Sequence, residues 1–309
     1  MITYRSRFLT RAEVWFDNEP LAKATLAEPA RRTVDPSPAD WILYHQRSRP
    51  VAEAMSRSFY TLLIDLTQSH DQLLAQLTEE TAYKIRRARE RDKIVCECCD
   101  PRDPAVMDGF ERMYKEFAAI KGLLPLNRAR LESLAAAGVL DISLAKDAQG
   151  KVLVYHASYR DSCRATQLES PSLYRALSDS AARNFNGRAN RYLTWSDILR
   201  YKEQGLKLFD FGGWHLGNDP EMLNINEFKR GFGGEVVREY QCEQILTLKG
   251  RLVLWAAKLL SQAKSVLSRG QSAINPEREF PDVQIAVAMK QPKHEPNGST
   301  IAVESAQCG

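Results

Sequence analysis

The 309-residue sequence has no run of about 20 consecutive apolar residues, which is the length that a membrane-spanning helix needs. We therefore do not expect the chain to cross a bilayer. Its N-terminal segment, MITYRSRFLT, has no apolar core of signal-peptide length. Together with six scattered cysteines, this favours a cytoplasmic protein, and peripheral contact with the inner face of the membrane stays open.

Metal-site patterns are missing as well. Cys96, Cys98 and Cys99 lie close together, but no second cluster of cysteine or histidine has the spacing of a zinc site. We expect these thiols to lie in a strand of small apolar residues. The sequence predicts no metal and no bound cofactor, and it has no recognisable nucleophile constellation that would form a covalent enzyme intermediate.

The chain also lacks a strong excess of charge, with 43 Lys and Arg against 39 Asp and Glu and a formal net charge of +4. This balance does not indicate a dedicated nucleic-acid-binding protein. With 44% apolar and 27% charged residues, the composition is that of a globular enzyme with enough residues for two domains.

Alternating strand and helix patterns predict a mixed α/β fold. Segments rich in apolar, β-branched and aromatic residues predict strands over residues 12–18, 39–46, 58–66, 140–145, 152–159 and 164–169. Apolar residues at helical spacing predict helices over residues 69–92, 105–122, 128–137, 173–186 and 190–205. The polar connection ending in Gly150 predicts a hairpin between the strands on either side of it.

The segment LKLFDFGG, residues 206–213, predicts a strand that is buried on both faces and carries one acid, Asp210. A buried carboxylate without a partner is unfavourable by several kcal/mol, so Asp210 needs one. The glycines at the end of this strand, and those of NEFKRGFGG up to Gly233 and Gly234, can adopt positive φ and let a ligand approach the main chain. Lys229 lies between the two glycine groups.

These segments resemble the FemAB group of peptidoglycan-bridge aminoacyltransferases, a branch of the GNAT acyltransferase superfamily. The shared pattern runs from NRYLTWSDILRYKEQG (residues 190–205) through FDFGG to INEFKRGFGGEVVREY (residues 225–240), and more loosely through residues 62–96 and 113–126. The resemblance implies a mixed-sheet, GNAT-like α/β fold in two tandem domains. We place these domains at residues 1–138 and 139–248, followed by a basic amphipathic helix at 249–269 and a tail at 270–309 that is expected to be disordered.

The resemblance also implies an activity: transfer of an aminoacyl group from aminoacyl-tRNA, or an acyl group from acyl-CoA, onto an amine of a cell-envelope precursor. The acceptor would be a peptidoglycan or polysaccharide precursor, which can be lipid-linked. The chain has no long coiled-coil arm, so a tRNA would contact the globular body, and it has no clear Q/R-x-x-G-x-G/A pyrophosphate loop for acyl-CoA. An acyl-CoA-dependent N-acyltransferase and a non-catalytic GNAT-like protein that binds an anionic envelope intermediate remain the alternatives.

Lys229 and Asp210 are the candidate catalytic residues. An amine that attacks an ester or thioester forms an oxyanion, which Lys229 would stabilise with help from backbone amides near Gly233 and Gly234. Asp210 is interpreted as a group that orients the attacking ammonium group or accepts its proton. A structural carboxylate that caps local amides is the alternative interpretation of Asp210.

Candidate substrate-binding residues fall into two groups. The basic segment KIRRARERDK, residues 84–93, offers Lys84 and Arg87 as phosphate ligands, with a solvated helix face as the alternative. The second group follows the C-terminal pattern and comprises Asn190, Trp195, Trp214, His215 and Phe228, in addition to Gly233 and Gly234. Trp195 and Asn190 have the helical spacing of core residues as well, and His156 is expected to be a hydrogen-bonded core histidine.

Residues 249–269, KGRLVLWAAKLLSQAKSVLSR, carry five cations and no acid at the spacing of an amphipathic helix. Two interpretations compete. The helix either contacts an anionic membrane surface or packs its apolar stripe on the N-terminal domain, and packing is the commoner behaviour of such helices.

Overall fold

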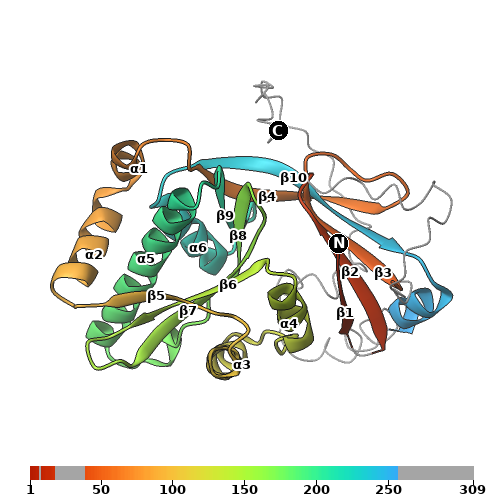
Figure 1. The fold of residues 1–309 in the computed structure, drawn as a ribbon. Coiled ribbons are helices and arrows are strands. Elements are labelled where there is room, and N and C mark those ends of the chain that lie inside the picture. The colour runs from red at the N-terminus through yellow and green to blue at the C-terminus, as the bar shows by residue number, and fades with distance from the viewer. Residues whose placement is uncertain (7, 18–38, 257–309) are drawn as a thin grey trace.

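The structure is a computed structural model that describes residues 1–6, 8–17 and 39–256. Its centre is one ten-stranded sheet with the order β1-β2-β3-β10-β4-β9-β8-β7-β6-β5 (Figure 1). The strands are β1 (Ile2–Ser6), β2 (Leu9–Trp15), β3 (Trp41–Arg47), β4 (Met55–Asp65), β5 (Val95–Cys99), β6 (Leu140–Lys146), β7 (Val152–Arg160), β8 (Arg164–Glu169), β9 (Leu208–Gly213) and β10 (Glu235–Ile245). The pairs β2–β3 and β8–β9 are parallel and the other pairs are antiparallel, so the predicted mixed-sheet α/β fold is confirmed.

Helices cover both faces of the sheet. They are α1 (His70–Gln76), α2 (Glu79–Glu90), α3 (Pro104–Lys121), α4 (Arg128–Ala136), α5 (Ser180–Glu203) and α6 (Pro220–Arg230), with a short 3₁₀ turn η2 at Tyr174–Ala176. The helix α5 packs against α2 on one face (Figure 1). The helices α3 and α4 share an apolar core with β6 and β7 on the other face.

The sequence of β6 explains how one strand serves both faces. Ile142 and Leu144 belong to the core under α3 and α4, whereas Ala145 belongs to the core under α5. Side chains alternate between the two faces of a strand, so a continuous run of apolar and small residues is buried twice. The neighbouring Ser143 faces α5 as well, where its hydroxyl donates to Asp197 at 2.9 Å.

Two predicted helices differ in the structure. The single helix expected over 69–92 is interrupted at Leu77, whose extended backbone ends α1, and the Thr78 side chain then accepts the Thr81 N–H and starts α2. The helix expected at 173–186 begins only at Ser180, because Asp179 caps it through the Ala182 N–H. It continues without a break through the helix predicted at 190–205.

Two strands and one helix were not predicted. They are β1, α6 and β10, and β10 inserts between β3 and β4 in the centre of the sheet. The strand predicted at 206–213 begins at Leu208. The strands β9 and β10 both pair with β4, so hydrogen bonds join segments on either side of residue 138. The division into two GNAT-like domains at that position stays a prediction.

The predicted helix at 249–269 is described only as far as residue 256, and residues 257–309 lie outside the described part of the chain, as does the predicted tail. Within the described part, Val253 and Leu254 pack on a cluster formed by Leu9, Trp41 and Leu43, whereas Trp255 is exposed. Packing on the protein thus accounts for one side of this segment, and membrane contact stays a prediction. No helix in the described ranges is long and apolar enough to cross a membrane.

Replacement of Gly234 is expected to destabilise the fold. Its φ of +87° is one that other residues avoid, and an added Cβ would lie 2.4 Å from the Leu63 carbonyl oxygen. We expect Gly234→Ala to lower the free energy of unfolding by about 1–3 kcal/mol. Urea denaturation measures this, with Gly138→Ala as the control, because Gly138 also has positive φ but has no atom within 4 Å of its Cβ position. Equal losses in the two variants would contradict a role for close packing at Gly234.

Candidate active site

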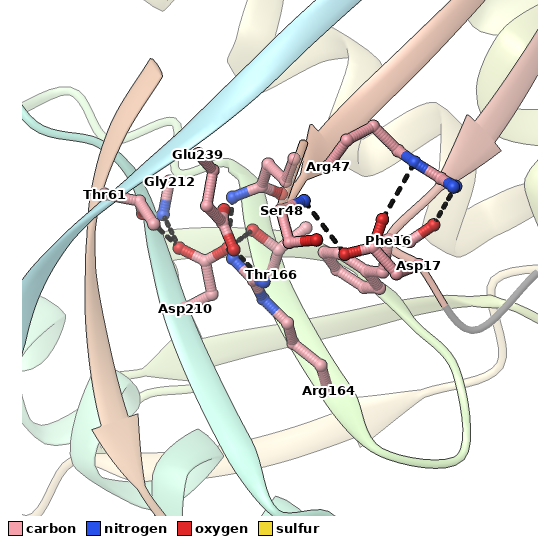
Figure 2. A network of polar contacts seen from close by, with 11 residues as sticks. Phe16, Asp17, Arg47, Ser48, Thr61, Arg164, Thr166, Asp210, Gly212 and Glu239 are labelled. Carbon is pink, nitrogen blue, oxygen red and sulfur yellow. Dashed lines mark hydrogen bonds and ion pairs between the residues drawn. The ribbon is translucent and has the colours of Figure 1, made fainter. Parts of the chain in front are cut away.

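Asp210 lies in the middle of β9 and is completely buried, with 0% of its surface exposed. Figure 2 shows that hydrogen-bond donors surround its carboxylate. The donors are Arg164 Nη2 at 2.6 Å and Nε at 3.2 Å, Thr166 Oγ1 at 2.8 Å, the Gly212 N–H at 2.8 Å, and the side chains of Thr61 and Gln46. Burial disfavours the charged carboxylate, but Arg164 and these hydrogen bonds outweigh it and hold the pKa of Asp210 below its usual value.

The partner that Asp210 was expected to need is Arg164 at the start of β8. The same guanidinium donates to the two oxygens of Glu239 on β10, at 2.6 and 2.9 Å, and lies 4.4 Å from the centre of the Phe16 ring. This buried ion network therefore ties together β8, β9 and β10. The Gly212 N–H bond matches the structural alternative weighed for Asp210, in which the carboxylate caps a local amide.

Arg47 at the end of β3 extends the contacts shown in Figure 2. Its guanidinium donates to the Phe16 carbonyl and pairs with Asp17 at 3.0 Å, and the Ser48 N–H donates to Asp17 at 2.9 Å. These bonds hold the end of β2 against the end of β3. The segment that contains Phe16 is thereby fixed beside Arg164.

Lys229 lies in the last turn of α6 and is 9% exposed. Its Nζ donates to the Gly212 carbonyl at 2.8 Å and to the Gly213 carbonyl. Burial lowers the pKa of Lys229 to about 8, and the charge of Asp210 opposes this shift. The two candidate catalytic residues therefore meet at Gly212, which accepts from Lys229 and donates to Asp210.

The glycine amides that were expected to assist Lys229 already have acceptors within the fold. The Gly233 N–H donates to the Arg230 carbonyl at 3.0 Å, and the Gly234 N–H lies 3.4 Å from Gln76 Oε1. Their backbone does have the predicted positive φ, at +82° and +87°. A role of these amides in oxyanion stabilisation stays a prediction.

A basic pocket of about 390 Å³ lies between α2, η2 and α5. It contains both predicted phosphate ligands, and the described residues that line it include no acid. Its lining cations are Lys84, Arg87, Arg183, Arg188 and Arg191. Three of them have carboxylate partners beside the pocket: Lys84 pairs with Glu80, and Arg188 and Arg87 pair with Asp92.

Arg191 forms no ion pair with a carboxylate among the described residues, although Glu80 lies near enough to influence its charge. Its Nε is buried and has no hydrogen-bond partner among the described residues. Burial lowers its pKa, because the nearby charges of Glu80 and Tyr174 compensate only partly. The guanidinium lies 4.9 Å from the centre of the Phe228 ring, and Phe228 precedes Lys229 on α6. Arg191 thus contacts the helix that carries Lys229.

The remaining predicted residues lie in different surroundings. Trp195 is 6% exposed and belongs to the core between α5 and the sheet. Asn190 Oδ1 lies 2.8 Å from His156 Nε2, and His156 Nδ1 lies 2.8 Å from Asp197, so both ring nitrogens of this core histidine have partners, as predicted. Neither Trp195 nor Asn190 is among the residues that line the basic pocket. Their contact with substrate stays a prediction.

Trp214 and His215 follow β9 and lie against α6. Arg230 is positioned 5.3 Å from the centre of the Trp214 ring. The His215 N–H donates to Asn226 Oδ1 at 3.2 Å, and Asn226 Nδ2 donates to the His215 carbonyl at 2.7 Å. This loop is therefore held to the helix that carries Phe228 and Lys229.

Arg164, and Arg183 and Arg188 of α5, were not identified as site residues from the sequence. Arg164 was assigned only to a strand, and no local signal identifies its partner, which lies 46 residues away. The arginines did carry a signal, because Asn184, Gly187, Arg188 and Arg191 follow the three-to-four-residue spacing of one helix face. The late start predicted for that helix, at residue 190, separated them from one another.

Neither family models nor curated protein sequences match this chain. Solved structures do. A structure of FemX matches with a TM-score of 0.50 and 15% identity over 60% of this chain and 61% of FemX, so the match spans about three fifths of that protein. The C-terminal domain of a putative lysylphosphatidylglycerol synthetase from Agrobacterium fabrum matches with a TM-score of 0.46 and 16% identity over 71% of this chain and 72% of that domain. L-PGS from Bacillus licheniformis matches with a TM-score of 0.44 and 14% identity over 65% of this chain and 67% of its own.

The similarity to FemX establishes the fold. The chain has a FemAB-like GNAT fold, as the resemblance in the C-terminal segments predicted. At 15% identity the likeness concerns architecture alone. The activity has to be argued from the residues of the site.

Proposed function

We propose that this protein is a transferase that moves an aminoacyl or acyl group from a phosphate-bearing donor onto an amine of a cell-envelope precursor. The observation that carries this proposal is the contact between Arg191 of the basic pocket and Phe228, which precedes the buried Lys229 on α6. A FemAB-like GNAT fold supports the reaction class. Both candidate donors, aminoacyl-tRNA and acyl-CoA, carry phosphates.

The basic pocket has the chemistry of a phosphate site. Guanidinium groups donate to phosphate oxygens in a planar fork, and ammonium groups add point charge. The Arg183 guanidinium is held by the carbonyls of Leu177 and Ser178, both at 2.9 Å, so it is oriented before a ligand arrives. Arg191 has a buried donor that a phosphate oxygen would satisfy. We therefore assign the phosphates of the donor to this pocket.

Lys229 is the residue that we assign to stabilisation of the transition state. Attack by an amine on the donor carbonyl places negative charge on its oxygen, and a buried cation stabilises that charge more than an exposed one. Glycine residues at positions 212 and 213 leave the main chain beside Lys229 free of side chains. Asp210 is assigned a positioning role. It accepts a hydrogen bond from the Gly212 N–H, and the carbonyl of the same glycine accepts one from Lys229.

The test is a transfer assay with two donors in parallel. Purified protein is incubated with aminoacyl-tRNA or with acyl-CoA and an envelope-precursor extract, and the masses of the acceptors are measured. An aminoacyl mass increment supports an aminoacyltransferase, and an acyl increment supports the N-acyltransferase alternative. Binding of a donor or of a precursor without any mass change would contradict the proposed activity and favour the non-catalytic binding protein.

Arg191→Ala is expected to raise the KM for the donor by about 10-fold or more, since a hydrogen bond to a charged group contributes roughly 1.5–3 kcal/mol. Steady-state kinetics with varied donor concentration measure the effect. Arg102→Ala is the control, because Arg102 is exposed and pairs with Asp100 at 3.0 Å, away from the pocket. An unchanged KM in Arg191→Ala would remove the basic pocket from the donor site.

A further inference from the structure

A second cavity, of about 130 Å³, lies on the side of the sheet that faces the α3–α4 connection. Its walls come from β1, β2, β3, β8, β10, the helices α3 and α4, and the segment Leu124–Asn127 that connects them. Its lining includes the acids Glu13 and Glu169 and the cation Arg130. No residue of this cavity was singled out by the sequence patterns.

Glu13 and Arg130 neutralise each other. Arg130 donates to both carboxylate oxygens of Glu13, at 2.6 and 3.2 Å, and Glu13 also accepts from Tyr4 Oη at 2.8 Å and Trp15 Nε1 at 3.0 Å. The carboxylate is 1% exposed and is paired with the Arg130 guanidinium. Arg130 therefore has little charge left for an anionic ligand, and this pair serves as a neutral wall.

Glu169 differs from Glu13, because no described residue forms a hydrogen bond or ion pair with its carboxylate. It is the last residue of β8 and lies partly exposed at the cavity. Because the Glu169 carboxylate faces the cavity without a partner, it favours a cation as the occupant of the cavity. Among the described residues, no group of three or more His, Cys, Asp or Glu side chains could hold a metal ion, which favours an organic cation over a metal ion as the occupant.

The size and position of the cavity limit which organic cations it can hold. Its volume is close to the roughly 150 Å³ of an apolar cavity that holds one benzene molecule, so it accepts a group of a few heavy atoms. Leu43, Leu126 and Tyr114 provide apolar wall for an alkyl stem. Tyr174 of the basic pocket follows Glu169 by five positions, a span of at most about 18 Å of extended chain.

We infer that this cavity binds the alkylammonium end of the acceptor and that Glu169 accepts the proton that the ammonium group loses before it attacks. This inference rests on the proposed transferase function and names the acceptor subsite. It requires the amine to reach the donor carbonyl along the β8–η2 connection. Glu169 is thereby a catalytic residue that the sequence patterns did not reveal.

The transfer requires only Glu169, the acceptor amine and the donor ester or thioester to account for every proton and bond. The ammonium group gives one proton to the Glu169 carboxylate, and the free amine attacks the donor carbonyl carbon, so that a C–N bond forms. The C–O bond of the tRNA ester, or the C–S bond of the thioester, then breaks. The second proton of the nitrogen leaves with the hydroxyl or thiol product.

The ionisation of Glu169 agrees with this role. Burial raises its pKa to about 7, and Arg130 opposes the shift. The charged and titratable residues that line the cavity with it are Arg130 from α4, Glu13 from β2, His45 and Tyr44 from β3, Glu243 and Cys242 from β10, Tyr4 from β1 and Tyr114 from α3. The carboxylate is thus ionised above pH about 7, where it can accept a proton.

The test is an NMR titration, without any donor, that compares Nα-acetyl-lysine amide with its uncharged analogue Nα-acetyl-norleucine amide at pH 8. We expect the lysine probe to bind at least 10-fold more tightly than the norleucine probe. Glu169→Gln should weaken lysine binding about 10-fold, whereas Glu235→Gln, a control at an exposed acid, should not. At pH 5 the wild type and Glu169→Gln should bind equally.

Equal binding of the two probes to the wild type, or no binding, would overturn the inference even if Glu169→Gln failed to fold. Equal lysine binding by wild type and folded Glu169→Gln at pH 8 would overturn it too. Because the titration contains no donor, it can succeed while the transfer assay fails, and then only the proposed activity is wrong. Transfer at the wild-type rate and KM by Glu169→Gln would overturn this inference alone.

Discussion

Lys229→Met is expected to lower the rate of transfer by about 100- to 1,000-fold, the range found when one group that stabilises an oxyanion is removed. The physical reason is the position of Nζ, which is buried at the end of β9 and points at the Gly212 and Gly213 carbonyls. The methionine side chain keeps much of the volume and removes the charge. Single-turnover kinetics with saturating donor measure the chemical step.

Lys115→Met is the matched control, because Lys115 is an exposed lysine on α3. Circular dichroism and the urea midpoint should show that Lys229→Met remains folded. A rate within twofold of wild type would exclude Lys229 from catalysis. In that case the hydrogen bonds to Gly212 and Gly213 would be purely structural.

The pH dependence gives an independent check of Lys229. Burial lowers its pKa to about 8, so the cation, and with it the stabilisation of the oxyanion, is lost above that pH. Transfer should therefore decline above pH about 8. Arginine stays charged throughout this range, so Lys229→Arg should retain part of the activity and lose the decline.

Arg164→Met is expected to lower the free energy of unfolding by about 3–5 kcal/mol, which is the typical effect of removing one partner of a buried ion pair. The substitution leaves Asp210 and Glu239 buried without their guanidinium, and Asp210 has no exposed surface through which water could replace it. Urea denaturation at pH 7 measures the loss. Arg102→Met, at an exposed ion pair, should cost at most about 1 kcal/mol.

The sign of the pH dependence follows from Asp210. Its pKa is lowered in the folded state, so its contribution to stability is present above the unfolded value of about 3.9 and is lost as the pH falls through the folded value. Without Arg164 this contribution disappears. The difference in stability between wild type and Arg164→Met should therefore be largest near neutral pH and shrink below pH 4. A constant difference would contradict an electrostatic origin.

Several features of the site follow from local sequence. Apolar neighbours on both sides of Asp210 indicated a buried carboxylate that needs a partner, and the structure provides one. The positive φ of Gly233 and Gly234 was indicated by glycine itself, which adopts such backbone at little steric cost. The basic character of residues 84–93 was equally plain.

Other features depended on contacts that no local pattern encodes. The strand β10, EVVREYQCEQI, mixes charged and apolar residues on both faces, so its central place between β3 and β4 was not apparent from its alternation. The break at Leu77 and Thr78 was hidden because apolar residues keep helical spacing across it. Trp195 has a pattern that suits a groove or a core, and packing places it in the core.

The sequence by itself determined most of the element types, the FemAB-like pattern, the buried acid in β9 and the cations of α2, because each depends on residues that are neighbours along the chain. Tertiary structure alone decided which of these groups meet. The pairing of β8 with β9 brings Arg164 to Asp210, and the packing of α2 on α5 adds Arg183, Arg188 and Arg191 to Lys84 and Arg87. Charge and hydrogen bonding act across space, so the partner of a buried group is set by strand register and helix packing.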